Sequence, residues 1–130
     1  QSDTMTPPIG LKNDHLHDCG EKPNCVSTRT SREKFKVDPI AYEENWETAK
    51  QKLIQAATQI GCTLKQDLGR YLHFEVKSRI FKFVDDVEFY FPQNDSLIEM
   101  RSASRVGHSD MGANAKRLKK IEALFFAQTL

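Results

Sequence analysis

The residues with the greatest capacity for chemistry lie in one stretch, RSASRVGHSDMGANAKR, which spans residues 101–117. Two arginines, Arg101 and Arg105, could each bind a phosphate or a carboxylate through paired N–H groups. Serines offer hydroxyl groups nearby, and amides at the start of a following helix would be free to donate. We therefore expect an anion-recognising loop over residues 101–112, with hydroxyl groups from Ser102, Ser104 and Ser109.

Acidic residues in the run FVDDVEF, residues 83–89, allow two interpretations of those arginines. Asp85, Asp86 and Glu88 could pair with them in a structural salt-bridge network, which would leave no charge for a ligand. They could instead line a polar groove with the arginines. Asp110 also counts against an anion site, because it can cap the following helix and satisfy its free amides. The sequence leaves both interpretations open.

Catalysis is the alternative to simple binding. A hydrolase or isomerase would use Asp85, Asp86 or Glu88 as a base, beside His73 or His108. The consecutive Ser, His and Asp in RVGHSDMG cannot converge as a triad. The chain also has no nucleophile elbow, P-loop or dinucleotide fingerprint. We expect a binding or accessory module without a cofactor rather than an enzyme, and a structural or partner-binding module is a further alternative.

The three cysteines predict one disulfide. Cys19 and Cys25 lie six residues apart in the loop-like stretch HLHDCGEKPNCV, and Cys62 would then be a free, buried thiol. Three reduced thiols in a cytosolic protein are the alternative. With His15 and His17 the same stretch could also offer nitrogen and sulfur ligands to zinc or copper. That spacing matches no standard zinc module, and a disulfide would remove half of the ligands, so we expect no metal.

Strands are predicted where apolar residues alternate. From Tyr71 to Ile80, and again around residues 86–91 and 98–101, apolar residues fall on one face and polar residues on the other. A shorter strand is expected at residues 62–66, with Cys62 and Leu64 pointing inward, and residues 26–30 could pair briefly as an edge strand. Depending on register, Arg79 would lie beside Asp86, and Glu88 beside Arg101. The polar side chains would form a solvated outer face.

Two helices flank these strands in the sequence. The first is expected to begin at Asp38-Pro39, an N-cap followed by proline, and to end before Gly61. The second runs from Ala113 nearly to the end of the chain. The expected fold is α+β: an antiparallel sheet of about four strands, in helix–four strands–helix order, with both helices packed on its apolar face. An irregular N-terminal segment over residues 19–38 precedes the first helix.

The bulk composition restricts the function further. The 130 residues suit one domain, which we place at residues 19–130 after a flexible tail over residues 1–18. A net charge of +1 gives no general attraction to nucleic acid. No apolar run approaches the roughly 20 residues of a spanning helix. Because the chain begins at Gln1 rather than Met, we expect a processed N-terminus and, with the disulfide, an extracytoplasmic protein.

Three motifs in order, PNCVST (residues 23–28), FVDDVEF (83–89) and RSASRVGHSDMGANAKR (101–117), resemble the family catalogued as domain of unknown function 1499. Tyr71-Leu72-His73 fits the same pattern. The resemblance implies a bacterial or plastid protein, often exported or tethered to a membrane through its N-terminus, and no known activity. The family commonly has proline beside its first Cys, where this chain has Gly20; His15 and His17 lie outside the pattern. The matching motif positions are Asn24, Cys25, Asp85, Asp86, Glu88, Arg101, Ser102, Ser104, Arg105, Ser109, Asp110 and Asn114.

Overall fold

The computed structural model describes residues 8–77 and 83–128, which form an α+β fold with two α-helices and antiparallel sheets. None of the described helices is long and apolar enough to cross a membrane. In chain order the elements are β1 (Leu11–Lys12), β2 (His15–Leu16), β3 (Cys25–Ser27), η1 (Glu33–Phe35), β4 (Ile40–Ala41), α1 (Trp46–Gln59), β5 (Thr63–Asp67), β6 (Tyr71–Lys77), β7 (Val84–Tyr90), β8 (Leu97–Ser104) and α2 (Ala113–Ala127).

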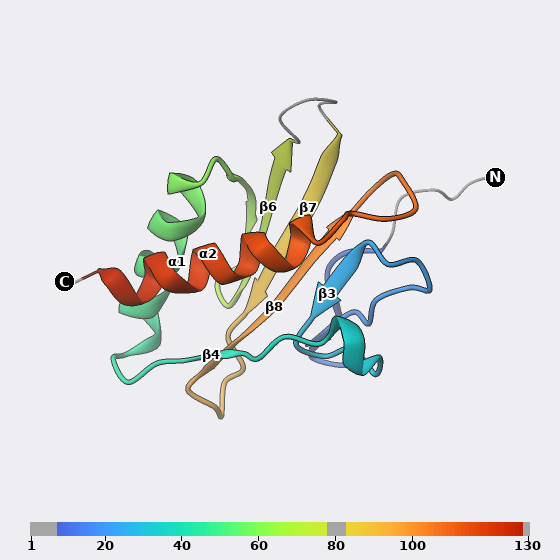
Figure 1. The fold of residues 1–130 in the computed structure, drawn as a ribbon. Coiled ribbons are helices and arrows are strands. Elements are labelled where there is room, and N and C mark those ends of the chain that lie inside the picture. Colours follow the sequence, from blue (N-terminus) through green and yellow to red (C-terminus); the bar gives the residue numbers. More distant parts are fainter. Residues whose placement is uncertain (1–7, 78–82, 129–130) are drawn as a thin grey trace.

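The main sheet has the strand order β3-β8-β7-β6-β5, and β4 also pairs with β8 (Figure 1). The predicted strands correspond to β5–β8, which follow one another as an antiparallel meander. Two further short strands make the sheet six-stranded, because β3 and β4 both lie along β8. Glu88 lies opposite Arg101, as expected, whereas Asp86 lies opposite Glu75. The prediction for Arg79 falls outside the described residues.

Both helices cover the same face of the sheet (Figure 1) and enclose the main core with it. Their buried side chains include Leu53 on α1 and Leu118, Ile121 and Phe125 on α2. The predicted start of the first helix was wrong: Asp38-Pro39 leads into β4, and α1 begins at Trp46 after the N-cap Asn45. Its end is as predicted, since Gly61 follows the C-cap with a φ of 99°.

The N-cap of α1 gives a direct test of this boundary. The side chain of Asn45 accepts a hydrogen bond from the Thr48 amide at 2.8 Å. We expect Asn45→Ala to lower the free energy of unfolding by about 1 kcal/mol in urea titration, because that amide loses its partner. Asn45→Asp should keep most of the stability. A loss of equal size from Asp38→Ala would indicate that the helix begins at the earlier position.

Strand β5 lies at one edge of the sheet and differs from its prediction. All five of its residues are exposed, and Leu64, expected to point inward, is 37% exposed. Its pairing with β6 shifts register between Leu64 and Gln66, which marks a β-bulge. The extra residue at a bulge disrupts the alternation of faces, so the simple period of two does not hold in this strand.

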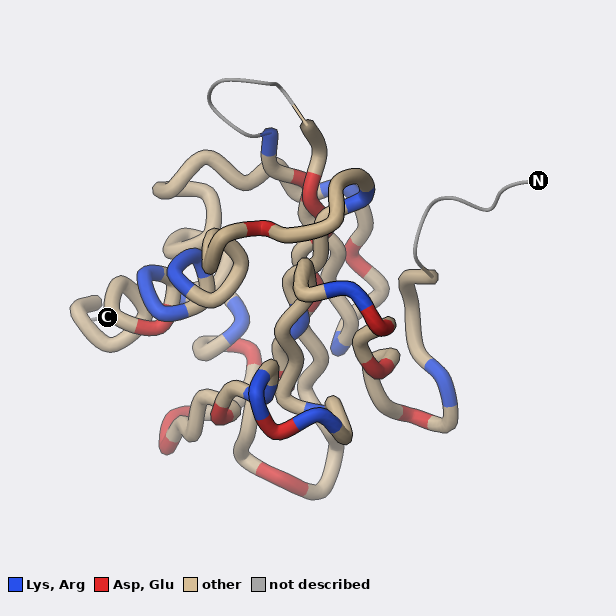
Figure 2. Tube along the Cα trace, turned by 45° about the vertical axis from the view of Figure 1, so that its right-hand side comes forward, with Lys and Arg blue, Asp and Glu red and all other residues tan. Residues whose placement is uncertain are grey.

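The other face of the sheet is covered in part by the N-terminal segment, which we call the arm (residues 8–18). Figure 2, turned by 45°, places α2 on one side of the sheet and the arm on the other. The amide of Gly10 donates to Glu88, and the amide of Leu16 donates to Glu99. Residues 1–7 lie outside the described residues, so a flexible tail there remains a prediction. Residues 8–18, assigned to the same tail, instead form β1 and β2 and contact the sheet.

Candidate functional site

A buried ion pair lies beneath the arm. Arg101 Nη1 donates to Glu88 Oε1 at 3.0 Å, and the two side chains are 2% and 0% exposed. The second oxygen of Glu88 accepts from the Tyr71 hydroxyl at 2.6 Å and from the Gly10 amide at 2.7 Å. Burial, and then the Glu88 charge, raise the pKa of Tyr71. The predicted solvated face is therefore wrong here, because the side chains of Arg101, Glu88 and Tyr71 are buried between arm and sheet.

A second cluster lies toward the other end of β6 and β7. Asp86 accepts two hydrogen bonds from Arg105, each 2.8 Å, and lies 2.7 Å from His73 Nε2. Arg105 Nη2 also donates to Glu75 at 2.6 Å. The Arg105 side chain is 30% exposed, whereas that of Asp86 is 3% exposed. The cluster thus combines a buried carboxylate with a guanidinium that reaches solvent.

The environment of Asp86 predicts that the folded protein loses stability in acid. Burial alone would raise the pKa of Asp86, but the hydrogen bonds from Arg105 and His73 outweigh it and lower the pKa to about 2. Because the folded pKa lies below the ordinary value of 3.8, this carboxylate stabilises the fold above pH 4. We expect about 2 kcal/mol of stability to disappear between pH 4 and pH 2.

Chemical unfolding at a series of pH values measures this effect. Asp86→Asn should flatten the profile between pH 4 and pH 2. Asp95→Asn is the matched control, because Asp95 is exposed in the turn before β8 and has no side-chain partner among residues 8–77 and 83–128. A profile that is equally steep in Asp86→Asn and wild type would contradict the prediction.

Another group of predicted residues lies on the face that the helices cover. Asp85 pairs with Arg117 of α2 at 2.9 Å, and burial raises the pKa of Asp85 against the effect of that arginine. Asn114 is fully buried at the start of α2. Its side-chain oxygen accepts from Ser102 and Arg117, and its side-chain nitrogen donates to Ser104, to Asp110 and to the carbonyl of Asn24.

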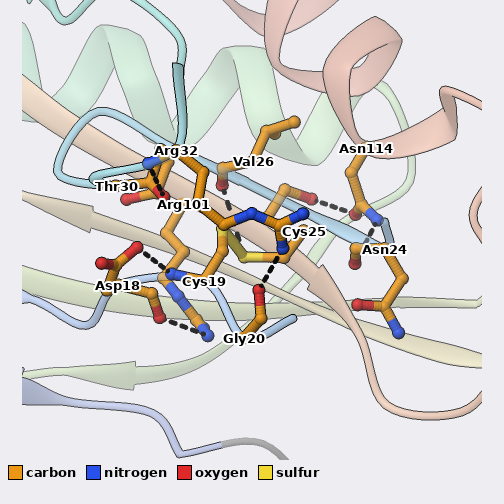
Figure 3. The surroundings of a disulfide bond; sticks show 12 residues. Asp18, Cys19, Gly20, Asn24, Cys25, Val26, Thr30, Arg32, Arg101 and Asn114 are labelled. Atoms are coloured by element: carbon orange, nitrogen blue, oxygen red, sulfur yellow. Dashed lines mark hydrogen bonds between the residues drawn. A yellow bond between two sulfur atoms is a disulfide. The ribbon is translucent and has the colours of Figure 1, made fainter. Parts of the chain in front are cut away.

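The disulfide joins Cys19 to Cys25, and Cys62 is free and buried, as predicted. Burial raises the pKa of the Cys62 thiol to about 11, which keeps it protonated. Figure 3 shows Asp18 and Arg101 beside the disulfide. The Asp18 carbonyl lies 3.5 Å from Arg101 Nη2, and Arg101 Nε is buried without a partner in the described part of the chain. The disulfide therefore anchors the end of the arm over the buried ion pair.

One group of side chains has the composition of a metal site. Ligand atoms of His73, Glu75 and Asp86 lie within 4.8 Å of one another. Arg105 already pairs with both carboxylates, so a metal ion would have to displace a guanidinium that makes three hydrogen bonds. In the N-terminal stretch, the disulfide uses both cysteines and His15 contacts Glu99 at 3.0 Å. The donor set fits a salt-bridge cluster better than a metal centre.

The structure divides the predicted site between two faces. Asp86, Glu88, Arg101 and Arg105 share the arm-side face, while Asp85, Ser102 and Ser104 face α2. Ser109 is exposed in the loop, where its hydroxyl oxygen accepts from the Met111 amide. Asp110 accepts from the Gly112 and Asn114 amides and so satisfies free amides at the start of α2, as predicted, although the N-cap position itself is Gly112. Sequence reasoning placed Arg117 beside the loop, and Glu75 and Tyr71 on the polar face of the sheet. It did not assign their individual partners, because that pairing depends on the strand register.

Comparison with known protein families assigns this chain to one of them. The family model described as protein of unknown function (DUF1499) matches residues 15–125, most of the chain. The chain belongs to the DUF1499 family. No significant match to a curated protein or to a solved structure was found. The resemblance noted in the three motifs is thereby confirmed.

The motif residues of this DUF1499 domain serve the fold at almost every position. Each acidic residue of FVDDVEF has a different arginine: Asp85 has Arg117, Asp86 has Arg105 and Glu88 has Arg101. Five polar residues of the other motifs contact Asn114, and Cys25 is in the disulfide; the five are Asn24, Ser102, Ser104, Asp110 and Arg117. Arg105 differs, because its Nη1 has no partner among the described residues and its side chain is partly exposed.

Proposed function

We propose that this DUF1499 domain is a binding or accessory module for a small anionic or polar ligand, contacted where the 101–112 loop leaves the arm-side face of the sheet. Arg105 carries the proposal. Asp86 and Glu75 fix its Nε and Nη2 atoms, and the N–H groups of Nη1 are left for a ligand. A guanidinium held in this way loses little freedom on binding.

The charges around Arg105 favour a polar ligand over a strongly anionic one. Two carboxylates, Asp86 and Glu75, contact the single guanidinium, so the cluster has no excess positive charge. Arg105 would therefore act as an oriented hydrogen-bond donor. A polar ligand with acceptor oxygens fits this arrangement better than a multiply charged anion, which the two carboxylates would repel.

Native mass spectrometry of the protein purified from its own cells tests the proposal. We expect a bound small molecule on the wild type, reduced at least tenfold in occupancy in Arg105→Gln. Arg29→Gln is the matched control, because Arg29 is exposed and its side chain has no partner in the described ranges. Equal occupancy in wild type and Arg105→Gln, or none in wild type, would refute the proposed contact.

A hydrolase or isomerase is the second candidate, and the contact between His73 and Asp86 favours it. Asp86 is ionised at neutral pH and can orient the imidazole, whose other nitrogen would act as the base. His73 is only 5% exposed, which leaves little area for a substrate. Turnover of an ester or phosphate ester that disappears in His73→Gln but persists in His108→Gln would favour this candidate over binding.

We also propose that the domain works outside the cytoplasm. The Cys19–Cys25 disulfide supports this, because such bonds persist in oxidising compartments. Alkylation of thiols in intact cells, followed by mass spectrometry, measures the redox state directly. We expect Cys19 and Cys25 to resist alkylation until a reductant is added; free alkylation of both would argue for a reducing compartment.

A further inference from the structure

Arg70, just before β6, is a guanidinium with no acidic partner in the described part of the chain. Its guanidinium carbon lies 4.3 Å from the centre of the Trp46 ring, and its Nη1 donates to the Phe91 carbonyl at 3.3 Å. Its own carbonyl accepts from the Phe91 amide at 2.8 Å. Backbone and side chain are thus both fixed, and the other N–H groups are left to bind a ligand.

The other described arginines differ from Arg70. Arg101, Arg105 and Arg117 each pair with a carboxylate. Arg29 and Arg32 are exposed to water, which solvates their charge. Among the described residues, Arg70 alone is a partly buried arginine with no carboxylate to offset its charge. A partly desolvated charge of this kind gains more from an anionic ligand than an exposed one does.

Two cavities meet at Arg70. The larger, about 400 Å³, is lined by Leu11, Leu68, Tyr71 and Tyr90 among others, and no carboxylate lines it. The smaller, about 340 Å³, is lined by Tyr42 and Trp46 and by the turn before β8. The only tryptophan and all three tyrosines of the chain therefore surround this one arginine.

The two cavities offer different chemistry. Leu68 is 66% exposed and Leu11 39% exposed, so the larger cavity has an apolar wall next to the guanidinium. In the smaller one, Gln93 and Asn94 are exposed amides whose side chains have no partner within residues 8–77 and 83–128. Two carboxylates also line it: Glu44, which pairs with Lys52 at 2.6 Å, and Asp95, whose side chain has no partner in the described part of the chain and would repel an anion. An anionic group is therefore best placed on the side of the larger cavity.

We propose that Arg70 and the two cavities beside it form a binding site for a small organic acid, which carries a carboxylate or phosphate group on a ring. Arg70 binds the anionic group with its free N–H groups. The leucines and Tyr90 contact the ring, as aromatic and aliphatic walls do in small-molecule sites. This site is separate from the proposed contact at Arg105, which is held by Glu75 near the opposite end of β6.

The fluorescence of Trp46 can report binding at this site, because it is the only tryptophan in the chain and its ring contacts the Arg70 guanidinium. The full chain is titrated with benzoate, phenyl phosphate, inorganic phosphate and the neutral benzyl alcohol while tryptophan emission is recorded. We expect a saturable change with benzoate or phenyl phosphate, at least tenfold weaker binding of inorganic phosphate, and no saturable change with benzyl alcohol. Comparison of the two ring anions distinguishes a carboxylate ligand from a phosphate ligand.

Variants then assign the signal to Arg70. Arg70→Gln should raise the Kd at least tenfold, because the charged hydrogen bonds are lost, and Arg70→Lys should give an intermediate value. Arg32→Gln is the matched control and should leave the Kd unchanged. Arg32 also stacks on an aromatic ring, Phe35 at 4.4 Å, and donates to two backbone carbonyls, but it lines neither cavity.

A separate variant covers the case in which Arg70→Gln does not fold. Leu68→Asp places a negative charge at an exposed position in the lining of the larger cavity, where the cost in stability is small. It should weaken binding of both ring anions at least fivefold. The proposal is overturned if neither ring anion gives a saturable change up to about 10 mM, or if the Kd is the same in wild type, Arg70→Gln and Leu68→Asp.

Discussion

Glu88→Ala should lower the free energy of unfolding by about 3–5 kcal/mol at neutral pH, as expected when one partner of a buried ion pair is removed. Arg101 would keep its charge in a site where its side chain is 2% exposed. The Tyr71 hydroxyl and the Gly10 amide would lose their acceptor as well. Urea unfolding followed by circular dichroism measures the change.

Two comparisons decide whether the loss comes from the uncompensated charge. The double variant Glu88→Leu/Arg101→Met should recover most of the stability, because an apolar pair needs no compensation. Lys50→Ala breaks the pair with Asp67, which is 42% exposed, and should cost at most about 1 kcal/mol. A cost for Glu88→Ala no larger than that of Lys50→Ala would show that water reaches the buried pair.

Asn114→Ala should be the second large effect, with a loss of about 3 kcal/mol. The substitution leaves the Ser102 and Ser104 hydroxyls, the Arg117 guanidinium and the Asn24 carbonyl without the amide that joins them. Each buried polar group that loses its partner costs roughly 1–3 kcal/mol, and relaxation of the neighbours offsets part of the sum. Thermal and urea unfolding both report the change.

Asn94→Ala is the control for this asparagine. Asn94 is exposed in the turn before β8, and its side chain has no partner in the described ranges, so its loss should stay within about 0.5 kcal/mol. Hydrogen exchange adds a readout specific to the network. In Asn114→Ala the amide of Ser104, which donates to the Asn24 carbonyl, should exchange faster, because that carbonyl loses one of the two donors that hold it. Unchanged exchange at Ser104 would contradict the proposed link.

The fold followed from sequence where local patterns are strong. The alternation in β6, β7 and β8 predicted three strands, and Gly61 and Ala113 marked helix ends correctly. The errors have local causes. Asp38-Pro39 has the chemistry of a helix start, but Ile40 pairs with Ile98, and this tertiary pairing takes the segment into the sheet. The sequence indicated only a brief edge strand near β3, and residues 40–41 are too short for a periodic signal, so β4 is the strand of this sheet that no pattern predicted.

The candidate site depended on information that no local pattern holds. Whether the arginines are free to bind a ligand depends on which carboxylates lie beside them in the fold. Arg117, Arg105 and Arg101 each pair with an acidic residue of β7. The predicted site grouped Asp85 with Asp86, although strand alternation places their side chains on opposite faces. Nothing in the sequence showed that residues 8–18 would cover the face that carries Asp86. The sequence did not single out Arg70 as a binding residue, because a residue in a turn belongs to no helical or strand periodicity.

The short span of the disulfide has a consequence for the order in which this domain assembles. Cys19 and Cys25 are six residues apart. The strand that carries Cys25 pairs with residues 101–103, and Asn24 bonds to Ser104 and Asn114. Contacts over six residues close far more readily than contacts over some 76 residues. The cysteines can therefore be joined while the chain is still emerging, whereas the segment around them has no surface to dock on until β8 and the start of α2 have been made.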